Sequence, residues 1–391
     1  MEMPIFSLRL QWSFLLVNLV LCISSFKLES HSSTPTFGNE TDKLALLAFK
    51  NYVANVPNGV LSSWNDSLHF CQWEGVTCSH QLQRVTALRL ESQRLAGSLP
   101  PIENLTFLRE LELSNNNLHG EIPIELTNCS SFRTVNFTRN NLTGQIPLHV
   151  GHMSKLLHLW LGTNNFSGMI PPSLHNLSSV IEFVATDNHL SGNFMSNMRF
   201  SSPQLCKFGK AMNQFTGIIP DTLSNISGLE LLDLGDNHLT GKVPDSLGVL
   251  KDLYWLTLDF NSSGRGMSGD LNFLNSLTNI SGLRLINAEG NHFGGVLPNS
   301  IVNLSTQLQQ LVLGENKISG NIPKEIGNLI NLIQFIATWN YLTGIIPTSI
   351  GKLQNLGELD FGWNRLSGLL LSTLGNLSQL FHLNMSYNNF G

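Results

Sequence analysis

The chain has 391 residues, of which 42% are hydrophobic and 13% are charged. Its 22 basic and 27 acidic residues give a net charge of -5, which excludes a protein whose main task is to grip nucleic-acid phosphates. The hydrophobic content and the absence of a charge block argue against a disordered chain. The length suggests two or three domains of about 150 residues each.

Residues 1–30 are expected to be a secretory signal peptide. Arg9 supplies a positive start, and the apolar stretch from Trp12 to Ile23 is shorter than the ~20 residues that span a bilayer. An N-terminal membrane anchor or a buried helix is the alternative interpretation of this stretch. No later segment has the length and apolar character of a membrane helix, so we expect the chain to enter the secretory pathway.

Residues 31–83 do not repeat and are expected to form an N-terminal cap with a short helix. Thr41 or Asp42 could cap this helix, and the Pro57-Asn58-Gly59 turn could end it. Three apolar residues are expected on its buried face: Leu44, Leu47 and Ala48.

Two cysteines of the cap are close enough in sequence to form a disulfide. A bridge between Cys71 and Cys78 would contribute about 2–3 kcal/mol by closing a short loop. Zinc is the competing interpretation of paired cysteines, but neither a second cysteine pair nor a nearby histidine pair completes four ligands. We therefore expect a disulfide.

From Val85 onward the chain repeats itself about every 24 residues, in 13 units of which the last is incomplete. One unit reads Leu108-x-x-Leu111-x-Leu113-x-x-Asn116-x-Leu118-x-Gly120-x-Ile122-Pro123. The L-x-x-L-x-L-x-x-N core at this period is typical of a leucine-rich repeat, so residues 84–391 are expected to form an α/β right-handed solenoid. The alternating core predicts a parallel sheet on the concave side, and the short return segment predicts irregular or 3₁₀ structure on the convex side.

An asparagine follows the expected strand in nearly every unit. Asn carries both a donor and an acceptor, so one side chain can satisfy backbone groups of its own turn and of the adjacent turn. The expected ladder consists of Asn116, Asn140, Asn164, Asn188, Asn213, Asn237, Asn316, Asn340 and Asn364, together with Asn261, Asn291 and Asn388. The first unit has Gln93 at this position, which an end repeat can tolerate.

The remaining cysteines are expected to be free thiols. Cys129 and Cys206 lie three units apart, and strands three apart are separated by about 14 Å, beyond the ~7 Å Cα limit of a disulfide. The fifth, Cys22, would leave with the signal peptide.

The chain contains 14 N-x-S/T sequons, whose sugars would solubilise a surface with few charges. Six of them lie four residues before the first apolar residue of a unit, and Asn303 is a further candidate; the set is Asn104, Asn128, Asn176, Asn225, Asn279, Asn303 and Asn376. Asn261 is also a ladder residue and is expected to be buried and unmodified. Asn136 and Asn384 are expected on the concave face.

No motif of the chain predicts catalysis or a bound cofactor. Gly264-Arg265-Gly266-Met267-Ser268-Gly269 matches a phosphate-binding glycine pattern, but it lies in an expanded unit without the strand and helix that such a loop needs. The 12 histidines are scattered, and no nucleophile, base and orienting acid come together. We expect neither an enzyme, nor a metal site, nor a cofactor site.

Aromatic residues at outward positions of the concave side are the candidate ligand-binding residues. Trp339, Trp363 and Tyr387 directly precede the ladder asparagine in three successive units, while Trp160 and Trp255 occupy other outward columns. Exposed aromatic residues beside polar groups are typical of binding hot spots. The alternative is an aromatic column that packs only with itself.

The N-terminal cap of plant extracellular leucine-rich-repeat proteins resembles three stretches of this chain: Asp42-Lys43-Leu44-Ala45-Leu46-Leu47-Ala48-Phe49-Lys50, Trp64-Asn65, and Cys71-x-Trp73-x-Gly75-Val76-x-Cys78. The ending Leu142-x-Gly144-x-Ile146-Pro147 resembles the same class, and residues 269–279 resemble an irregular repeat of receptor kinases that sense microbial patterns. The resemblance implies a cell-surface receptor whose ectodomain binds a peptide or protein and recruits a co-receptor kinase. It also implies further repeats, a membrane helix and a kinase domain beyond Gly391.

Because the chain stops at Gly391 inside a repeat, we expect a receptor ectodomain fragment or a truncated product, which could act as a soluble decoy. A full-length receptor would lie at the plasma membrane, and this shorter chain would lie in the apoplast. The alternative is a secreted inhibitor of cell-wall-degrading enzymes such as polygalacturonases. No nucleic-acid partner is expected.

Overall fold

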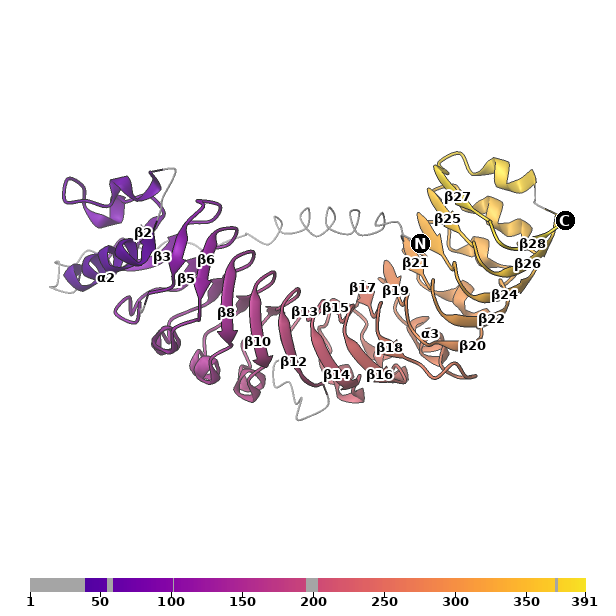
Figure 1. Cartoon of the computed structure of the whole chain (residues 1–391), viewed down its shortest axis with the longest axis horizontal. Coiled ribbons are helices and arrows are strands. Elements are labelled where there is room, and N and C mark those ends of the chain that lie inside the picture. Colours follow the sequence, from indigo (N-terminus) through magenta and orange to yellow (C-terminus); the bar gives the residue numbers. More distant parts are fainter. Residues whose placement is uncertain (1–38, 55–58, 101, 195–202, 370–371) are drawn as a thin grey trace.

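The computed structural model describes residues 39–54, 59–100, 102–194, 203–369 and 372–391. The expected signal peptide and Cys22 lie outside these residues, as do Pro57 and Asn58 of the turn expected after the cap helix. Figure 1 shows one elongated arc, with the cap at its indigo end and the successive repeats stacked along it.

The inner side of the arc is lined by a sheet of 14 strands, one from the cap and one from each repeat (Figure 1). In order, these are β2 (Val76–Cys78), β3 (Val85–Arg89), β5 (Glu110–Glu112), β7 (Thr134–Asn136), β9 (His158–Trp160), β11 (Glu182–Val184), β13 (Lys207–Gly209), β15 (Leu231–Asp233), β17 (Trp255–Thr257), β19 (Leu285–Asn287), β21 (Gln310–Val312), β23 (Gln334–Ile336), β25 (Glu358–Asp360) and β27 (His382–Asn384). Only β2 runs antiparallel, against β3. The predicted solenoid with a parallel concave sheet is confirmed.

A second set of strands, which was not predicted from the sequence, follows the ladder position in each repeat. Together with β1 (Val53–Ala54) of the cap, which pairs antiparallel with β4, eight of them form one sheet: β4 (Ala96–Ser98), β6 (Asn117–Gly120), β8 (Asn141–Gln145), β10 (Asn165–Met169), β12 (His189–Asn193), β14 (Gln214–Ile218), β16 (His238–Gly241) and β18 (Ser262–Ser263). Five continue beyond a break: β20 (Gly294–Val296), β22 (Lys317–Asn321), β24 (Tyr341–Gly344), β26 (Arg365–Gly368) and β28 (Asn389–Phe390).

Short 3₁₀ helices close most repeats on the convex side, as predicted. They are η4 (Ile124–Asn128), η5 (Leu148–His152), η6 (Pro172–Asn176), η7 (Asp221–Asn225), η8 (Asp245–Val249), η9 (Asn299–Asn303), η10 (Ile326–Asn328), η11 (Thr348–Lys352) and η12 (Ser372–Asn376), after η2 (Val60–Ser63) and η3 (Phe70–Gln72) in the cap. The leucine positions of the repeats merge into one continuous buried core between these helices and the sheets, against which Leu380 of the last repeat packs while only partly buried.

The glycine-rich loop of the expanded repeat causes the break in the second set of strands. It leads from β18 to the helix α3 (Asn272–Leu277) and takes the place of a strand. The carboxylate of Asp270 accepts the backbone N–H groups of Arg265, Met267 and Gly294 at 2.9, 3.0 and 3.1 Å. Burial raises the pKa of Asp270, but these hydrogen bonds outweigh it and hold the pKa below its usual range. The motif therefore folds as a self-contained structural loop.

The cap helix α2 (Asn39–Tyr52) buries a different face from the one predicted from the sequence. Leu44 is 60% exposed and Ala48 is exposed, whereas Ala45, Leu46 and Phe49 are buried; Leu47 is only partly buried. The expectation for Leu44 and Ala48 was wrong, because it ignored the one polar residue that the helix must also bury.

That residue is Asp42, which does not cap the helix but lies inside it with no exposed surface. Its Oδ1 accepts from Arg84 Nη2 at 2.7 Å, and its Oδ2 accepts from the backbone N–H of Val85 at 2.7 Å. The carboxylate thereby ties the helix to the first strand of the solenoid and fixes the rotation of α2. A buried charge of this kind is stable only when it is paired.

The predicted disulfide is present between Cys71 and Cys78, whose Cα atoms are 5.5 Å apart. Cys129 and Cys206 are not bonded to another described cysteine. Burial, with a smaller contribution from nearby carboxylates, raises the pKa of both thiols to about 11, so they stay protonated and unreactive at neutral pH.

The asparagine ladder connects each turn to its neighbours. Nδ2 of Asn164 donates to the carbonyls of Phe137, Leu161 and Gly162 at 2.9, 3.2 and 3.2 Å, and its Oδ1 accepts from the N–H of Leu142 at 3.0 Å. The equivalent bonds recur from Asn116 to Asn388, with Asn261 among them. One amide thus satisfies four backbone groups that belong to two repeats.

Replacing Asn164 by Leu should destabilise the solenoid locally, because a leucine side chain cannot satisfy these four buried groups. Each orphaned group costs about 1–3 kcal/mol. We expect a lower melting temperature and faster hydrogen exchange in the strands around residues 137–165. The matched control is Asn117→Leu at an exposed position of β6. Equal melting temperatures for the two variants would contradict the role of the ladder.

Candidate ligand-binding surface

Three of the predicted aromatic residues form a continuous stack. The rings of Trp339 and Trp363 are 4.1 Å apart at 9°, and the rings of Trp363 and Tyr387 are 3.6 Å apart at 15°. The three side chains nevertheless remain 51%, 38% and 65% exposed. The rings therefore cover each other's faces and present their outer edges to solvent. The alternative of an aromatic column that packs with itself is therefore correct for the ring faces in the stack. The ring edges remain available to a ligand.

The sequence predicted these residues on the inner strands. They lie instead in the turns that follow β23, β25 and β27. Its members have φ angles of 52°, 53° and 54°, which is the left-handed region. This conformation turns the chain so that the next residue, the ladder asparagine, points into the core. The side chain before it is thereby directed along the edge of the inner sheet.

An open groove of about 650 Å³ runs beside the stack. Its lining combines the stack with Tyr341 on β24 and Arg365 on β26. The Arg365 guanidinium lies 4.8 Å from the centre of the Tyr341 ring, and Glu315 contributes to the lining one repeat earlier. The groove thus combines aromatic edges, one cation and one carboxylate. Tyr341 and Arg365 escaped the sequence analysis because the strands that carry them were not foreseen.

The two other predicted aromatic residues lie apart from the groove, on the inner sheet. Trp160 on β9 donates its indole N–H to Glu182 at 3.0 Å, and Glu182 pairs with Lys207 at 2.9 Å. Trp255 on β17 is half-buried between Leu231 and Leu285 of the neighbouring strands. The structure therefore brings together three of the five candidates and separates the other two.

Carboxylates gather on the inner face near the groove. Burial raises the pKa of Asp259 to about 7, with a further contribution from Asp233. Burial raises the pKa of Glu289 to about 7 as well, assisted by Glu315, Asp360 and Glu358. The repeat period could have revealed this cluster, because Asp259, Glu289 and Glu315 occupy nearly the same place in successive units.

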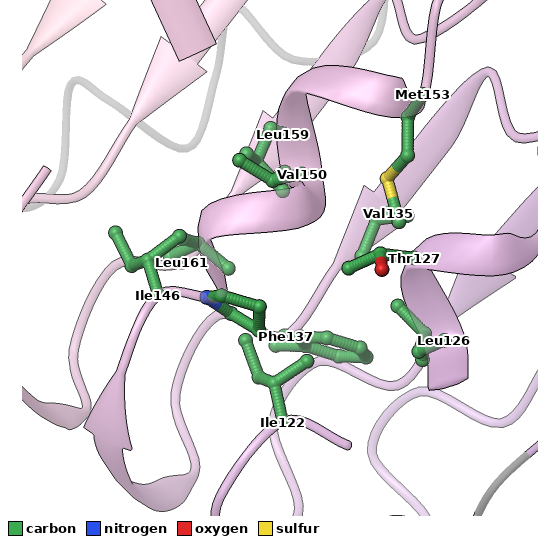
Figure 2. A pocket seen from close by; sticks show the side chains of 11 residues that line it. Ile122, Leu126, Thr127, Val135, Phe137, Ile146, Val150, Met153, Leu159 and Leu161 are labelled. Atoms are coloured by element: carbon green, nitrogen blue, oxygen red, sulfur yellow. The ribbon is translucent and has the colours of Figure 1, made fainter. Parts of the chain in front are cut away.

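One small cavity lies inside the repeats of the described part of the chain. Figure 2 shows the apolar lining of a cavity of about 20 Å³, with Phe137, Ile146 and Met153 among its residues. This volume holds about one water molecule, and the lining offers such a molecule almost no polar partner. The cavity is a packing defect of the core.

Five members of the expected glycosylation row end 3₁₀ helices, whereas Asn104 lies in a turn and Asn279 lies just after α3. The described side chains of the row are exposed: Asn104, Asn128, Asn225, Asn279, Asn303 and Asn376. The side chain of Asn176 lies outside the described part of the structure. Asn136 and Asn261 are each only 8% exposed, and Asn136 donates to Glu112 at 2.8 Å, so neither is free to carry a sugar. Asn384 lies on β27 and is half-buried.

Among the described residues, no three His, Cys, Asp or Glu side chains are placed to hold a metal ion. None of the described helices combines the length and the apolar character needed to cross a membrane.

Comparisons with known proteins agree with the repeat architecture. A family model described as "Leucine rich repeat N-terminal domain" matches residues 39–79, and the model "Leucine Rich Repeat" matches residues 107–129, 155–177, 228–250 and 307–329. The LRR receptor-like serine/threonine-protein kinase EFR of Arabidopsis thaliana is 48% identical over 89 residues, which are 22% of this chain and 9% of that protein.

Two solved structures are similar over most of the chain. The PEPR1-AtPEP1 structure has a TM-score of 0.78 and 31% identity, covering 90% of this chain and 49% of that chain. A plant ice-binding protein has a TM-score of 0.61 and 25% identity, covering 79% of this chain and 89% of that chain. The chain has the leucine-rich-repeat architecture and is similar to plant leucine-rich-repeat receptor kinases. The matched part is 9% of EFR, and the chain covers 49% of the PEPR1 chain.

The carboxylates of Asp259 and Glu289 should make the folded state less stable as pH rises. Their folded pKa values of about 7 lie above the ordinary values of 3.8 and 4.5, so the unfolded chain loses these protons first. Their stabilising contribution is complete below pH ~4 and disappears as pH rises through 7. Asp259→Asn combined with Glu289→Gln should therefore raise the melting temperature at pH 8 by about 1–3 °C relative to the parent.

The same double variant should show a much smaller gain at pH 5, where both native carboxyls are protonated. The matched control is Asp252→Asn, which neutralises an exposed carboxylate. Melting curves of the three proteins at both pH values provide the test. A gain that is equal at pH 5 and pH 8 would contradict the raised pKa values.

Proposed function

We propose that this chain is the ligand-binding part of a plant leucine-rich-repeat receptor kinase and that it binds a peptide or protein segment without covalent chemistry. The observation that carries the proposal is the groove beside Trp339, Trp363 and Tyr387. Aromatic and arginine side chains dominate binding hot spots, and this groove offers both on a rigid repeat scaffold. The ordered stack also lowers the entropy that these side chains lose on binding.

The relatives support a signalling role. EFR is a receptor-like kinase by name, and the PEPR1 structure contains AtPEP1 as its partner. The glycine-rich expanded repeat, with its resemblance to receptors that sense microbial patterns, favours an immune ligand. A co-receptor kinase would then complete the signalling complex.

The Cys71–Cys78 disulfide and the row of exposed sequons fit a chain that matures in the secretory pathway. The proposed location is the outer face of the plasma membrane for a full receptor, or the apoplast for this chain alone.

A sugar placed in the groove should block binding without disturbing the fold. Tyr341→Asn creates a sequon with Thr343 at the first position of β24, where β8 naturally carries Asn141-Leu142-Thr143. The probes are peptides selected from a random phage library against the secreted, unmodified chain. We expect that the glycosylated Tyr341→Asn protein no longer binds these peptides.

The matched control is His238→Asn, which creates the same kind of sequon with Thr240 at the start of β16, away from the groove. A second variant, Trp339→Ala with Trp363→Ala, should also lose binding while its secretion is preserved. Peptides that bind both glycosylated variants equally would overturn the groove as the site. Loss of secretion by the tryptophan variant would assign the stack to folding.

One observation favours a second function, ice binding. At one position of the second set of strands, hydroxyl residues recur in a row of five repeats and again in a row of three, spaced by about 4.8 Å as in any sheet. They are Thr143, Ser167, Ser191, Thr216 and Thr240, and then Ser319, Thr343 and Ser367. The plant ice-binding protein has the same architecture. Against this function, Thr216 and Thr240 donate to the carbonyls of Gly192 and Gly217, so their hydroxyls are used within the sheet.

Thermal hysteresis measurements discriminate between the two functions. The receptor proposal predicts that the purified chain leaves the growth temperature and the shape of ice crystals unchanged at micromolar concentration. Faceted crystals that disappear on substitution of Thr216 and Thr240 by Tyr would favour ice binding instead.

A further inference from the structure

The charge of the inner surface changes along the solenoid. From β17 to β25, the strands and the turns that follow them carry five carboxyl groups, and Arg284 immediately precedes β19; the carboxyl groups are Asp259, Glu289, Glu315, Glu358 and Asp360. Among the described residues, none of the five forms an ion pair with a lysine or arginine; only His382 approaches Asp360, at 4.0 Å. The surface beside the groove is therefore acidic, and the raised pKa values of Asp259 and Glu289 leave these two groups partly protonated near neutral pH.

These carboxylates are close enough to act on one another. Glu315, Asp360 and Glu358 all raise the pKa of Glu289, in addition to the effect of its burial. Like charges held together in this way destabilise the free protein, and a cation that binds among them relieves the repulsion. The arrangement favours a positively charged ligand over a neutral or negative one.

One end of the aromatic stack provides a specific place for such a cation. Trp363 covers one face of Trp339, and the described residues include no ring on its other face. In the preceding repeat the same turn position is occupied by Glu315, and the turns are joined by the hydrogen bond from Asn316 N–H to the Trp339 carbonyl at 3.1 Å. Both side chains line the groove. An indole face beside a carboxylate attracts lysine and arginine side chains through cation–π and ionic interactions.

We propose that the groove binds a positively charged peptide segment, with a lysine or arginine side chain of the ligand between Glu315 and the edge and ring-free side of Trp339. The inference rests on the proposed function and adds the charge of the ligand and its orientation. Arg365 lines the same groove two repeats further along, over Tyr341. The groove thus has a carboxylate at one end and a cation toward the other, and the basic part of the ligand lies at the Glu315 end.

Three fluorescein-labelled hexapeptides test the charge preference: glycine alternating with arginine, with serine or with glutamate. Fluorescence anisotropy with the full secreted chain should show binding of the arginine peptide, weakening as salt screens the charges, and no binding of the other two. Glu315→Gln should weaken the arginine peptide about fivefold, and Trp339→Leu should do the same.

One control variant removes a charge that the inference does not use. Glu110→Gln removes a carboxylate on β5 that pairs with Arg89, and it should leave the affinity unchanged. Arg365→Gln removes the cation of the groove, which repels a basic ligand, and it should therefore increase the affinity. Because Glu315 is exposed, its substitution leaves the fold intact even if Trp339→Leu disturbs the stack.

Equal binding of the arginine and serine peptides would overturn the charge inference. Binding of the arginine peptide that Glu315→Gln and Trp339→Leu leave unchanged would overturn the assigned place. In either case the experiment with phage-selected peptides still tests the proposed function. A sugar at position 341 blocks their binding to the groove whatever their charge. Failure of the two proposals is therefore distinguishable.

Discussion

The hydrogen bonding of the ladder asparagine is the constraint on which the rest of the solenoid depends. Each amide must reach backbone groups of two repeats, so the residue before it adopts a left-handed conformation, from Asn115 through Tyr387. That conformation points the side chain of the preceding residue along the edge of the inner sheet. The stack of Trp339, Trp363 and Tyr387 is thus a geometric consequence of the ladder. A structural requirement creates a regular column of exposed positions, and the sequence is free to fill it with binding residues.

Apart from the cap disulfide, the structural features that were predicted correctly repeat with the period of the sequence. The inner strands recur in every unit, and the ladder and the 3₁₀ segments recur in most of them, so many weak signals support each assignment. The rotation of α2 was missed because it depends on one contact, Asp42 with Arg84, between residues 42 positions apart. The second set of strands was missed because its pattern, such as Asn141 to Gln145, contains glycine and polar residues that single-chain propensity places in turns. These strands form only because neighbouring repeats present the same backbone beside them.

The expanded repeat divides the molecule without interrupting its inner surface. The inner sheet continues through β17 and β19, whereas the loop anchored by Asp270 separates the second set of strands into groups of eight and five. The groove lies along the second group, between the turns of the inner sheet and strands β24 and β26. The aromatic stack therefore follows strands of the inner sheet, which spans the described repeats, whereas Tyr341 and Arg365 belong to the short sheet of the C-terminal repeats. The loop fixes where such a groove can begin.

The low charge of the chain gives the inner carboxylates their significance. Only 13% of the residues are charged, yet several carboxylates gather around Glu289 and Glu315, where burial and mutual repulsion make them costly to the folded state. Repeats tolerate many residues at these outward positions, as Gly314, Thr338 and Gly362 show near the same place in the units that follow Glu289. Folding does not demand carboxylates there. A cluster that reduces stability and that the scaffold does not require is best explained by a ligand that compensates its charge, as is common where stability is sacrificed at binding sites.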